Sequence, residues 1–327
     1  MILATRKSNS RDGELIVVNK SRTRGVSAKA IAPTLQRALD LWVMVEPQLR
    51  ALSELHEMGA AVDSFNLQPS ELLSPLPRAY QWVDGSAFLN HVILVRKARG
   101  AEPPKTLKTD PLMYQGGSDS FLAPNEPIWA LSEEWGIDFE SEVAVVTDDV
   151  PMGCSAEEAK GHIQLVMICN DVSLRNLIPA ELEKGFGFLQ SKPASAFAPF
   201  ALTPDELGDS WQDARVHLPL ETHLNGELFG NPDAGKEMHF SFADLIAHVA
   251  KTRTLCAGSV VGSGTVSNED RARGSSCLAE KRMIEKIDQG ETKTPFMKFG
   301  DQVRIEMKKN GVSLFGVIEQ RVSKPQK

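Results

Sequence analysis

The sequence predicts a mostly β protein with some α structure, in which a small α+β domain (residues 1–77) precedes a larger β-rich domain (residues 78–327). The first part contains a long helical pattern, whereas the rest consists of short strand-like runs that turn signals interrupt. Between them, the segment LSPLPR (73–78) carries two prolines in three positions, which is typical of an extended linker. We therefore place the domain boundary there.

Composition restricts the possible functions. The 327 residues carry a formal net charge of −7, with 42% hydrophobic and 24% charged residues, as in ordinary globular proteins. A nucleic-acid binder would need a basic surplus to neutralise phosphates. The longest apolar runs, at 92–95 and 165–168, are far shorter than the roughly 18 residues that span a bilayer, and Arg6 and Lys7 come too early for a signal-peptide core. We expect a cytoplasmic protein that binds neither nucleic acid nor membranes.

The four cysteines are scattered, and none forms a C-x-x-C pair. We expect them to be reduced and mostly buried. They are Cys154, Cys169, Cys256 and Cys277.

In the first domain, residues 14–18 follow a turn and read as a short strand. Apolar residues recur at helical spacing between residues 32 and 58, with Pro33 near the start. Pro47 is expected to interrupt or kink this helix, and Gly59 to end it.

In the second domain, residues 141–146 and 162–169 are expected to be strands. Asn-Gly pairs at 225–226 and 310–311 separate further strand-like runs and predict two hairpins, because this pair supplies the positive φ angles of a type I′ turn. A helix is predicted over residues 241–252, with Ser241 as its N-cap.

A pair of carboxylates gives the clearest chemical signal. Glu140 and Glu142 are two residues apart, so in a strand both would point to one face. Two adjacent anions repel each other unless water or a cation separates them, and a hard divalent cation accepts oxygen ligands. The alternative is the solvated face of an exposed strand.

Two aspartates and a histidine extend this signal. Asp171 ends a wholly apolar run, where an aspartate either caps a turn or serves a site. Asp84 begins the segment that leads to His91, and a histidine close to a metal ligand could act on a bound substrate or water. A plain structural histidine is the alternative. The other six histidines show no metal-ligand spacing.

Three more positions have two interpretations each. Lys192 lies in an otherwise uncharged stretch and either faces an anionic intermediate or is a surface lysine. The Gly-rich run 258–265 matches no nucleotide motif, but its backbone N–H groups and the Thr265 hydroxyl suit a carboxylate. Glu280 precedes several basic residues, so a surface ion pair is its plain interpretation.

Together the segments resemble the fumarylacetoacetate hydrolase family. The resemblance covers about residues 76–322 and rests on motifs in the family's order: WVDGSAFLNH (82–91), DFESE (138–142), NDVSLR (170–175), QSK (190–192), GSGTVS (262–267) and FGDQV (299–303). It implies a β-roll catalytic domain, and the segment before it resembles the extra N-terminal domain of fumarylacetoacetases proper. Homodimers are usual for the family.

The resemblance also implies roles for individual residues. His91 would be the water-activating base, oriented by Glu280, with Lys192 adding positive charge. The implied metal is Mg²⁺ or Ca²⁺, with Mn²⁺ as a further option, and its ligands would be Asp84, Glu140, Glu142 and Asp171. Implied substrate contacts are Tyr114, Arg175 and Thr265, with Ser86 where the family has an aromatic hydroxyl, and a lid arginine at Arg96 or Arg99. A glutamine that the family has shortly after Arg175 is missing, and Gln190 is a candidate to replace it.

The main functional hypothesis is a metal-dependent hydrolase that cleaves a carbon–carbon bond in a 1,3-diketo acid. The substrate would be fumarylacetoacetate, cleaved to fumarate and acetoacetate in tyrosine or other aromatic catabolism. The alternative keeps the metal but catalyses decarboxylation or keto–enol isomerisation of a dicarboxylic keto acid. A non-enzymatic metal-binding scaffold would not need His91, Lys192 and Glu280 together.

Overall fold

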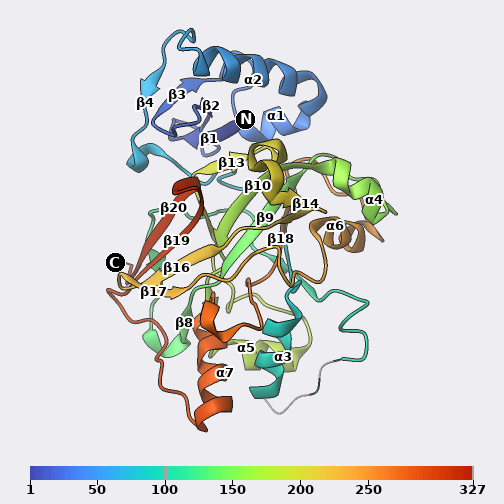
Figure 1. Ribbon diagram of the computed structural model, residues 1–327, viewed down its shortest axis with the longest axis vertical. Coiled ribbons are helices and arrows are strands. Elements are labelled where there is room, and N and C mark those ends of the chain that lie inside the picture. The colour runs from blue at the N-terminus through green and yellow to red at the C-terminus, as the bar shows by residue number, and fades with distance from the viewer. Residues whose placement is uncertain (99–101, 103, 326–327) are drawn as a thin grey trace.

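The computed structural model describes residues 1–98, 102 and 104–325, and it confirms the mostly β architecture with a small α+β part at the N-terminus (Figure 1). In that part, two helices cover one face of a small antiparallel sheet. The strands are β1 (Ile2–Arg6), β2 (Glu14–Val18), β3 (Arg24–Ser27) and β4 (Phe65–Asn66), and the helices are α1 (Leu35–Asp40) and α2 (Trp42–Glu57). The strand predicted at residues 14–18 is confirmed.

The helical segment breaks at a different residue from the one that the sequence indicates. Pro47 lies inside α2, and the break falls at Leu41, whose φ of −124° and ψ of 27° are not helical. The predicted interruption at Pro47 is therefore wrong. A proline removes one backbone N–H donor, and the packing of Trp42, Val45 and Leu49 in the core holds this helix together around that loss. Gly59 follows the end of α2 with a φ of 70°, as expected for a helix stop.

One long sheet runs through both parts of the chain. Its order is β4-β3-β2-β1-β13-β10-β9-β18-β5-β6, and β12 (Ala196–Phe197) pairs with β10 off this path. The join is antiparallel pairing of β1 with β13, in which Ile2 lies opposite Leu202. The proline-rich linker is therefore a boundary in the sequence but not in the sheet. The other strands are β13 (Phe200–Leu202), β10 (Ile163–Asn170), β9 (Ser141–Thr147), β18 (Val260–Gly262), β5 (Trp82–Gly85) and β6 (Met113–Gly116).

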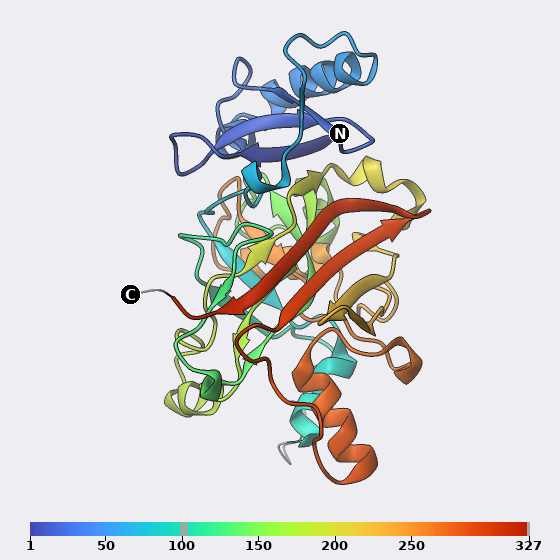
Figure 2. The same ribbon diagram turned by 90° about the vertical axis from the view of Figure 1, so that its left-hand side faces the viewer.

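A second sheet, with the order β17-β16-β19-β20-β7, wraps around the first (Figure 2). It comprises β17 (Glu227–Gly230), β16 (Leu220–Leu224), β19 (Gln302–Lys309), β20 (Val312–Ser323) and β7 (Ile128–Trp129). Both Asn-Gly hairpins are confirmed, since Asn225, Gly226, Asn310 and Gly311 all have positive φ. Two short ladders complete the β structure: β8 (Ile137–Asp138) with β11 (Ser173–Leu174), and β14 (Trp211–Gln212) with β15 (Arg215–Val216).

Three helices gather at the end of the long sheet that lies away from the N-terminal part (Figure 1). They are α3 (Leu89–Ala98), α5 (Ile178–Lys184) and α7 (Leu278–Gln289). The helix predicted over residues 241–252 is α6 (Phe242–Ala250), and Ser241 caps it as expected. The short helix α4 (Ala156–Ala159) lies beside it. Single 3₁₀ turns lie at Pro69–Glu71, Glu133–Trp135, Lys160–His162 and Arg271–Arg273. The longer 3₁₀ segment Pro204–Ser210 is kinked at Gly208.

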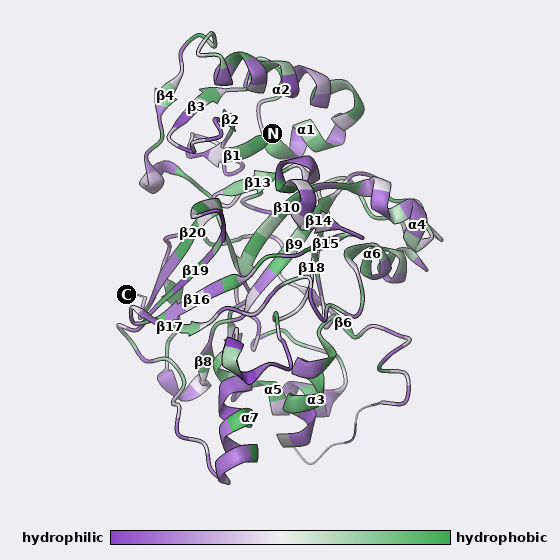
Figure 3. Cartoon of the chain, in the orientation of Figure 1, coloured by the Kyte–Doolittle hydropathy of each residue, from purple (hydrophilic) through white to green (hydrophobic). Residues whose placement is uncertain are grey.

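The core divides along the two faces of the long sheet. Alternate residues of β9 belong to different clusters: Val143 and Val145 pack on one face, and Ala144 and Val146 on the other. All seven residues of this strand are buried, and the central strands form a hydrophobic band in Figure 3. Among the described residues, no helix is both long and apolar enough to cross a bilayer.

Candidate active site

The sequence-predicted residues converge at the end of the long sheet, where β5 and β6 meet α3 and α5. A cavity of about 310 Å³ opens there. Its lining includes the predicted residues Asp84, Ser86, His91, Arg96, Tyr114, Glu140, Arg175, Lys192 and Thr265. Three more predicted residues, Glu142, Asp171 and Glu280, lie behind this lining and are buried. Segments that are almost 200 residues apart in the chain thus contribute to one site.

Three buried carboxylates form an acidic group at the base of the cavity. One oxygen from each of Asp84, Glu142 and Asp171 lies within 4.8 Å of the others. Burial, followed by the charge of Asp171, raises the pKa of Asp84, and burial followed by the charge of Asp84 raises the pKa of Glu142. Among the described residues, Glu142 Oε1 has no hydrogen-bond partner. Repelling carboxylates with a free buried oxygen fit a hard divalent cation, which takes oxygen ligands.

Glu140 has different contacts from Glu142, because cations surround it. Its two oxygens contact Arg175 Nη2 at 2.6 Å and Lys192 Nζ at 2.5 Å. Burial opposes ionisation, but the two cations outweigh it and lower the pKa of Glu140. Both glutamates are buried, so the alternative of a solvated strand face is wrong.

Lys192 connects Glu140 to the acidic group. Its Nζ also lies 2.5 Å from Asp171 Oδ2 and 5.1 Å from the centre of the Tyr114 ring. Burial disfavours the charged amine, but Asp171 and Glu140 raise the pKa of Lys192. Its side chain is only 8% exposed, so the surface-lysine alternative is wrong. A cation fixed between two carboxylates is well placed to meet negative charge that develops in the cavity.

Asp171 is held by hydroxyl donors as well. Tyr114 Oη donates to Asp171 Oδ2 at 2.6 Å, and Ser195 Oγ donates to Asp171 Oδ1 at 2.7 Å. Tyr114 reaches this position because β6 pairs with β5, in which it lies opposite Asp84. The resemblance implies a substrate contact for Tyr114, and in this structure its hydroxyl is already bonded to Asp171.

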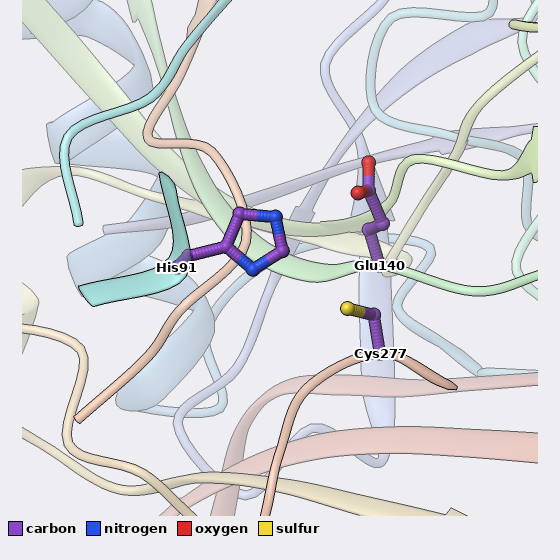
Figure 4. A group of neighbouring side chains, drawn as sticks. All are labelled: His91, Glu140 and Cys277. Carbon is purple, nitrogen blue, oxygen red and sulfur yellow. The ribbon is translucent and has the colours of Figure 1, made fainter. Parts of the chain in front are cut away.

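His91 and Glu280 form a hydrogen-bonded pair close to Glu140. Their side chains meet at 2.9 Å between Nδ1 and Oε2, although 189 residues separate them in the chain. The pair forms because α3 packs against α7, which brings the first turns of the two helices together. Glu280 is fully buried, so its plain interpretation as a surface ion pair is wrong. Figure 4 shows the imidazole edge directed toward Glu140.

The Gly-rich run supports Asp84 rather than offering all its donors to a ligand. The Gly264 N–H donates to Asp84 Oδ1 at 2.9 Å. Gly264 has a φ of 76°, and a Cβ atom there would lie 2.2 Å from the carbonyl oxygen of Gly85. Thr265, the next residue, lines the cavity, and its contact with a substrate carboxylate stays a prediction.

The structure also contains supporting residues to which the sequence analysis assigned no role. Asp138 accepts hydrogen bonds from the backbone N–H groups of Leu278 and Ala279 at the start of α7, and from Arg175 Nε. It thereby fixes α7, and with it Glu280, against the site. Its place at the end of the short strand β8, inside the DFESE motif, is the only sequence signal that could have indicated this role.

A second supporting residue is Glu181 in α5. Its carboxylate accepts the backbone N–H groups of Leu189, Gln190 and Ser191, which immediately precede Lys192. Burial opposes its ionisation, but the Ser191 hydroxyl and these N–H groups lower the pKa of Glu181 to about 2. Gln190 itself is exposed and does not line the cavity, although the sequence analysis offered it as a replacement for the missing glutamine. Of the two candidate lid arginines, Arg96 lines the cavity and Arg99 lies outside the described residues.

Comparison with known proteins agrees with this geometry. Residues 81–323 match the family described as "Fumarylacetoacetate (FAA) hydrolase C-terminal", and residues 1–78 match "Fumarylacetoacetase N-terminal domain 2". A curated relative, the oxaloacetate tautomerase YisK of Bacillus subtilis, is 25% identical over 252 residues, which cover 76% of this chain and 73% of the relative.

Solved structures share the fold at low sequence identity. A fumarylacetoacetate hydrolase from Exiguobacterium antarcticum aligns with a TM-score of 0.65 at 17% identity, over 99% of this chain and all of that one. A 2-hydroxyhepta-2,4-diene-1,7-dioate isomerase from Mycobacterium marinum aligns with a TM-score of 0.61 at 17% identity, over the full length of both chains. The match over residues 81–323, together with the acidic group and the cavity, shows that this chain belongs to the fumarylacetoacetate hydrolase family of enzymes.

Proposed function

We propose that this protein is a metal-dependent keto–enol tautomerase that acts on a short dicarboxylic 2-oxo acid, with oxaloacetate as the first substrate to test. The observation that carries the proposal is the arrangement around one 310 Å³ cavity of a base, a cation and an acidic group: His91, Lys192 and the carboxylates near Asp84. The relative named oxaloacetate tautomerase supports this reaction over hydrolysis.

His91 is the proposed proton carrier. In the enol-to-keto direction, the enol oxygen loses a proton and C3 gains one, so the substrate's atoms are conserved and no water is consumed. The hydrogen bond from His91 Nδ1 to Glu280 leaves Nε2 free to face the substrate. Glu280 also holds the ring in one orientation, as an orienting carboxylate does for other catalytic histidines.

Lys192 is the proposed partner of the enolate oxygen. The intermediate between keto and enol forms carries negative charge, and a preorganised cation stabilises such charge by roughly 3 kcal/mol. Arg175 and Lys192 already neutralise Glu140, so the charge pattern is assembled before substrate arrives.

Asp84, Glu142 and Asp171 would hold the divalent cation, with Glu140 as the fourth ligand that the family resemblance implies. Such an ion supplies a Lewis acid that polarises the substrate's carbonyl group. The proposal covers Mg²⁺, Ca²⁺ and Mn²⁺ as the bound ion. The homodimer implied by the resemblance stays a prediction.

The lining suits an acid with two charged ends. One end of the substrate would chelate the metal ion beside the carboxylates at the bottom of the cavity. The guanidinium of Arg96 on α3 would pair with the carboxylate at the other end. Thr265 and Ser86 offer hydroxyl groups between them. Apolar residues of α3 and α5, among them Val92, Val95 and Ile178, form part of the sides.

The test follows the loss of enol absorbance when enol oxaloacetate is mixed with the Mg²⁺-loaded protein. We expect His91→Asn to lower kcat by roughly 10²–10⁴, the usual contribution of positioned proton transfer. The control is His239→Asn, which changes an exposed histidine outside the cavity lining. Tautomerisation no faster than in buffer with Mg²⁺ alone would overturn the proposal.

Hydrolysis of fumarylacetoacetate is the second candidate, and the His91–Glu280 pair favours it because such a pair can also activate water. The two reactions differ in their products. Hydrolysis releases fumarate and acetoacetate, decarboxylation releases CO₂, and tautomerisation releases nothing. Assaying all three with one protein preparation distinguishes them.

A further inference from the structure

We propose that His91, Glu140 and Cys277 form a second metal site, which binds Zn²⁺ or a similarly soft divalent ion and thereby switches the enzyme off. Figure 4 shows the three side chains, which come from α3, from the segment before β9 and from the start of α7. One ligand atom from each lies within 4.8 Å of the other two. The site shares no ligand with the group of Asp84, Glu142 and Asp171, but it takes Glu140, which the family resemblance implies as a fourth ligand of the hard cation, and it adds an inhibitory function to the proposed activity.

The donor atoms indicate the kind of ion. Nitrogen, sulfur and carboxylate oxygen are the ligands that Zn²⁺ takes in proteins, usually with tetrahedral geometry. Mg²⁺ and Ca²⁺ prefer oxygen ligands alone. The active site therefore contains two neighbouring groups of metal ligands. Asp84, Glu142 and Asp171 suit a hard ion, and the group with Cys277 suits a softer one.

The outer contacts of His91 match those of a metal-binding histidine. Such a histidine almost always gives its second ring nitrogen to a carboxylate or carbonyl, which fixes the ring and makes the ligating nitrogen more basic. Here the Nδ1 contact with Glu280 leaves Nε2 as the ligand atom. The second carboxylate oxygen of Glu280 is buried and has no hydrogen-bond partner among the described residues, so the carboxylate behind His91 keeps one free acceptor.

Cys277 is held in place for this role. It is the N-cap of α7, its Sγ accepts the Glu280 N–H at 3.3 Å, and it is completely buried. Asp138 fixes the same helix start by accepting two further N–H groups. Burial, followed by the charge of Asp138, raises the pKa of the free Cys277 thiol, so the thiolate would form only when the metal binds. A thiol that coordinates Zn²⁺ loses its proton outright.

Occupancy of this site would block catalysis by a simple route. A bound ion takes the lone pair of His91 Nε2, which the proton transfer requires. It also recruits Glu140 away from Lys192 and Arg175. His91 and Glu140 line the open cavity, so the ion can enter from solvent while Cys277 lies behind them.

The direct test uses Co²⁺, which takes the same ligands as Zn²⁺ and absorbs light. With the carboxylate site saturated by Mg²⁺, we expect one equivalent of Co²⁺ to give the near-ultraviolet band of a thiolate–cobalt bond. Cys277→Ser and His91→Asn should each remove the band. Cys169→Ser is the matched control, because Cys169 is also buried but lies beside Glu142. No band in the wild type, a band that survives Cys277→Ser, or one lost in Cys169→Ser overturns the proposal.

The second measurement is affinity. We expect Zn²⁺ to inhibit turnover at saturating Mg²⁺, and Glu280→Gln to weaken Zn²⁺ binding by about 10–100-fold, the usual effect of losing such an outer carboxylate. Unchanged Zn²⁺ affinity in Glu280→Gln would contradict the proposed geometry. The cobalt spectrum needs no substrate, so its failure is distinguishable from failure of the proposed tautomerase activity.

Discussion

The hydrogen bonds that the Glu181 carboxylate accepts from the loop before Lys192 allow one prediction to be worked out from the structure. Four donors converge on this carboxylate: the N–H groups of Leu189, Gln190 and Ser191, at 2.7–3.2 Å, and the Ser191 hydroxyl at 2.5 Å. The next residue is Lys192. We expect Glu181→Gln to leave the fold intact but to release the loop that positions this amine.

The magnitude follows from the contacts. Glutamine keeps one acceptor oxygen, so about half of the contacts are lost and an N–H group replaces one acceptor. Hydrogen bonds to charged groups contribute about 1.5–3 kcal/mol and neutral ones about 0.5–1.5 kcal/mol. If the Lys192 position depends on one of these charge-assisted hydrogen bonds, its loss costs about 1.5–3 kcal/mol. At about 1.4 kcal/mol per factor of ten, kcat should fall by roughly 10–100-fold, with a smaller change in KM.

The assay is steady-state turnover at matched Mg²⁺. Glu183→Gln is the control, because Glu183 lies on the same helix but is exposed. In a Lys192→Met background, Glu181→Gln should cost little more, since the two residues act as one unit. If Glu181→Gln keeps full activity, or if its effect simply adds to that of Lys192→Met, then Glu181 does not act through Lys192.

The same carboxylate predicts a pH dependence of stability. Its pKa is about 2 in the folded protein and 4.5 ordinarily, so its stabilising effect is fully present above about pH 4.5 and disappears as the pH falls toward 2. We expect the melting temperatures of wild type and Glu181→Gln to differ at neutral pH and to converge below pH 4.5. A difference that persists unchanged at pH 3 would contradict this account.

Two further predictions concern the cation site. Glu142→Gln should raise the melting temperature of the metal-free protein, because it replaces a carboxyl whose ionisation is opposed by burial and by its neighbours Asp84 and Asp171. It should also abolish the rise in melting temperature that Mg²⁺ causes, and an Mg²⁺ effect equal to that of the wild type would show that Glu142 is not a ligand. Gly264→Ala should destabilise the fold and weaken Mg²⁺ binding, because its Cβ would lie 2.2 Å from a backbone oxygen. Gly59→Ala is the control, since Gly59 has a similar φ but open space around it. This variant should lose only about 1 kcal/mol in thermal unfolding and keep its Mg²⁺ affinity.

Local patterns predicted local structure well in this chain. The strands at 141–147 and 163–170, both Asn-Gly hairpins and the capped helix α6 form close to where the sequence indicates them. These elements have a continuous apolar run, a turn with defined φ angles or a capping side chain. Each of these signals acts within a few residues, so the surrounding fold has little opportunity to override it.

The helices around the cavity have weaker local signals, such as the Cys277 cap of α7 and the proline in the first turn of α5. The notable pattern of α3 is its apolar run at 92–95, and that of α7 is its cluster of charged residues, so neither indicates a helix that borders a site. Similarly, Pro47 is expected to interrupt or kink a helical segment that in fact breaks at Leu41. In each case contacts with distant segments decide the outcome, and the local sequence does not contain them.

The sequence by itself determined the family, the β-rich architecture and the set of carboxylates that we propose as the cation site. Only the tertiary structure decided which of those residues contact one another. It separated Glu140 from Glu142, joined His91 to Glu280 across 189 residues, and gave Lys192, Asp138 and Glu181 their buried partners. The physical reason is that charge pairing depends on distance and burial, both of which are set by strands and helices that are far apart in the chain and meet only in the folded protein.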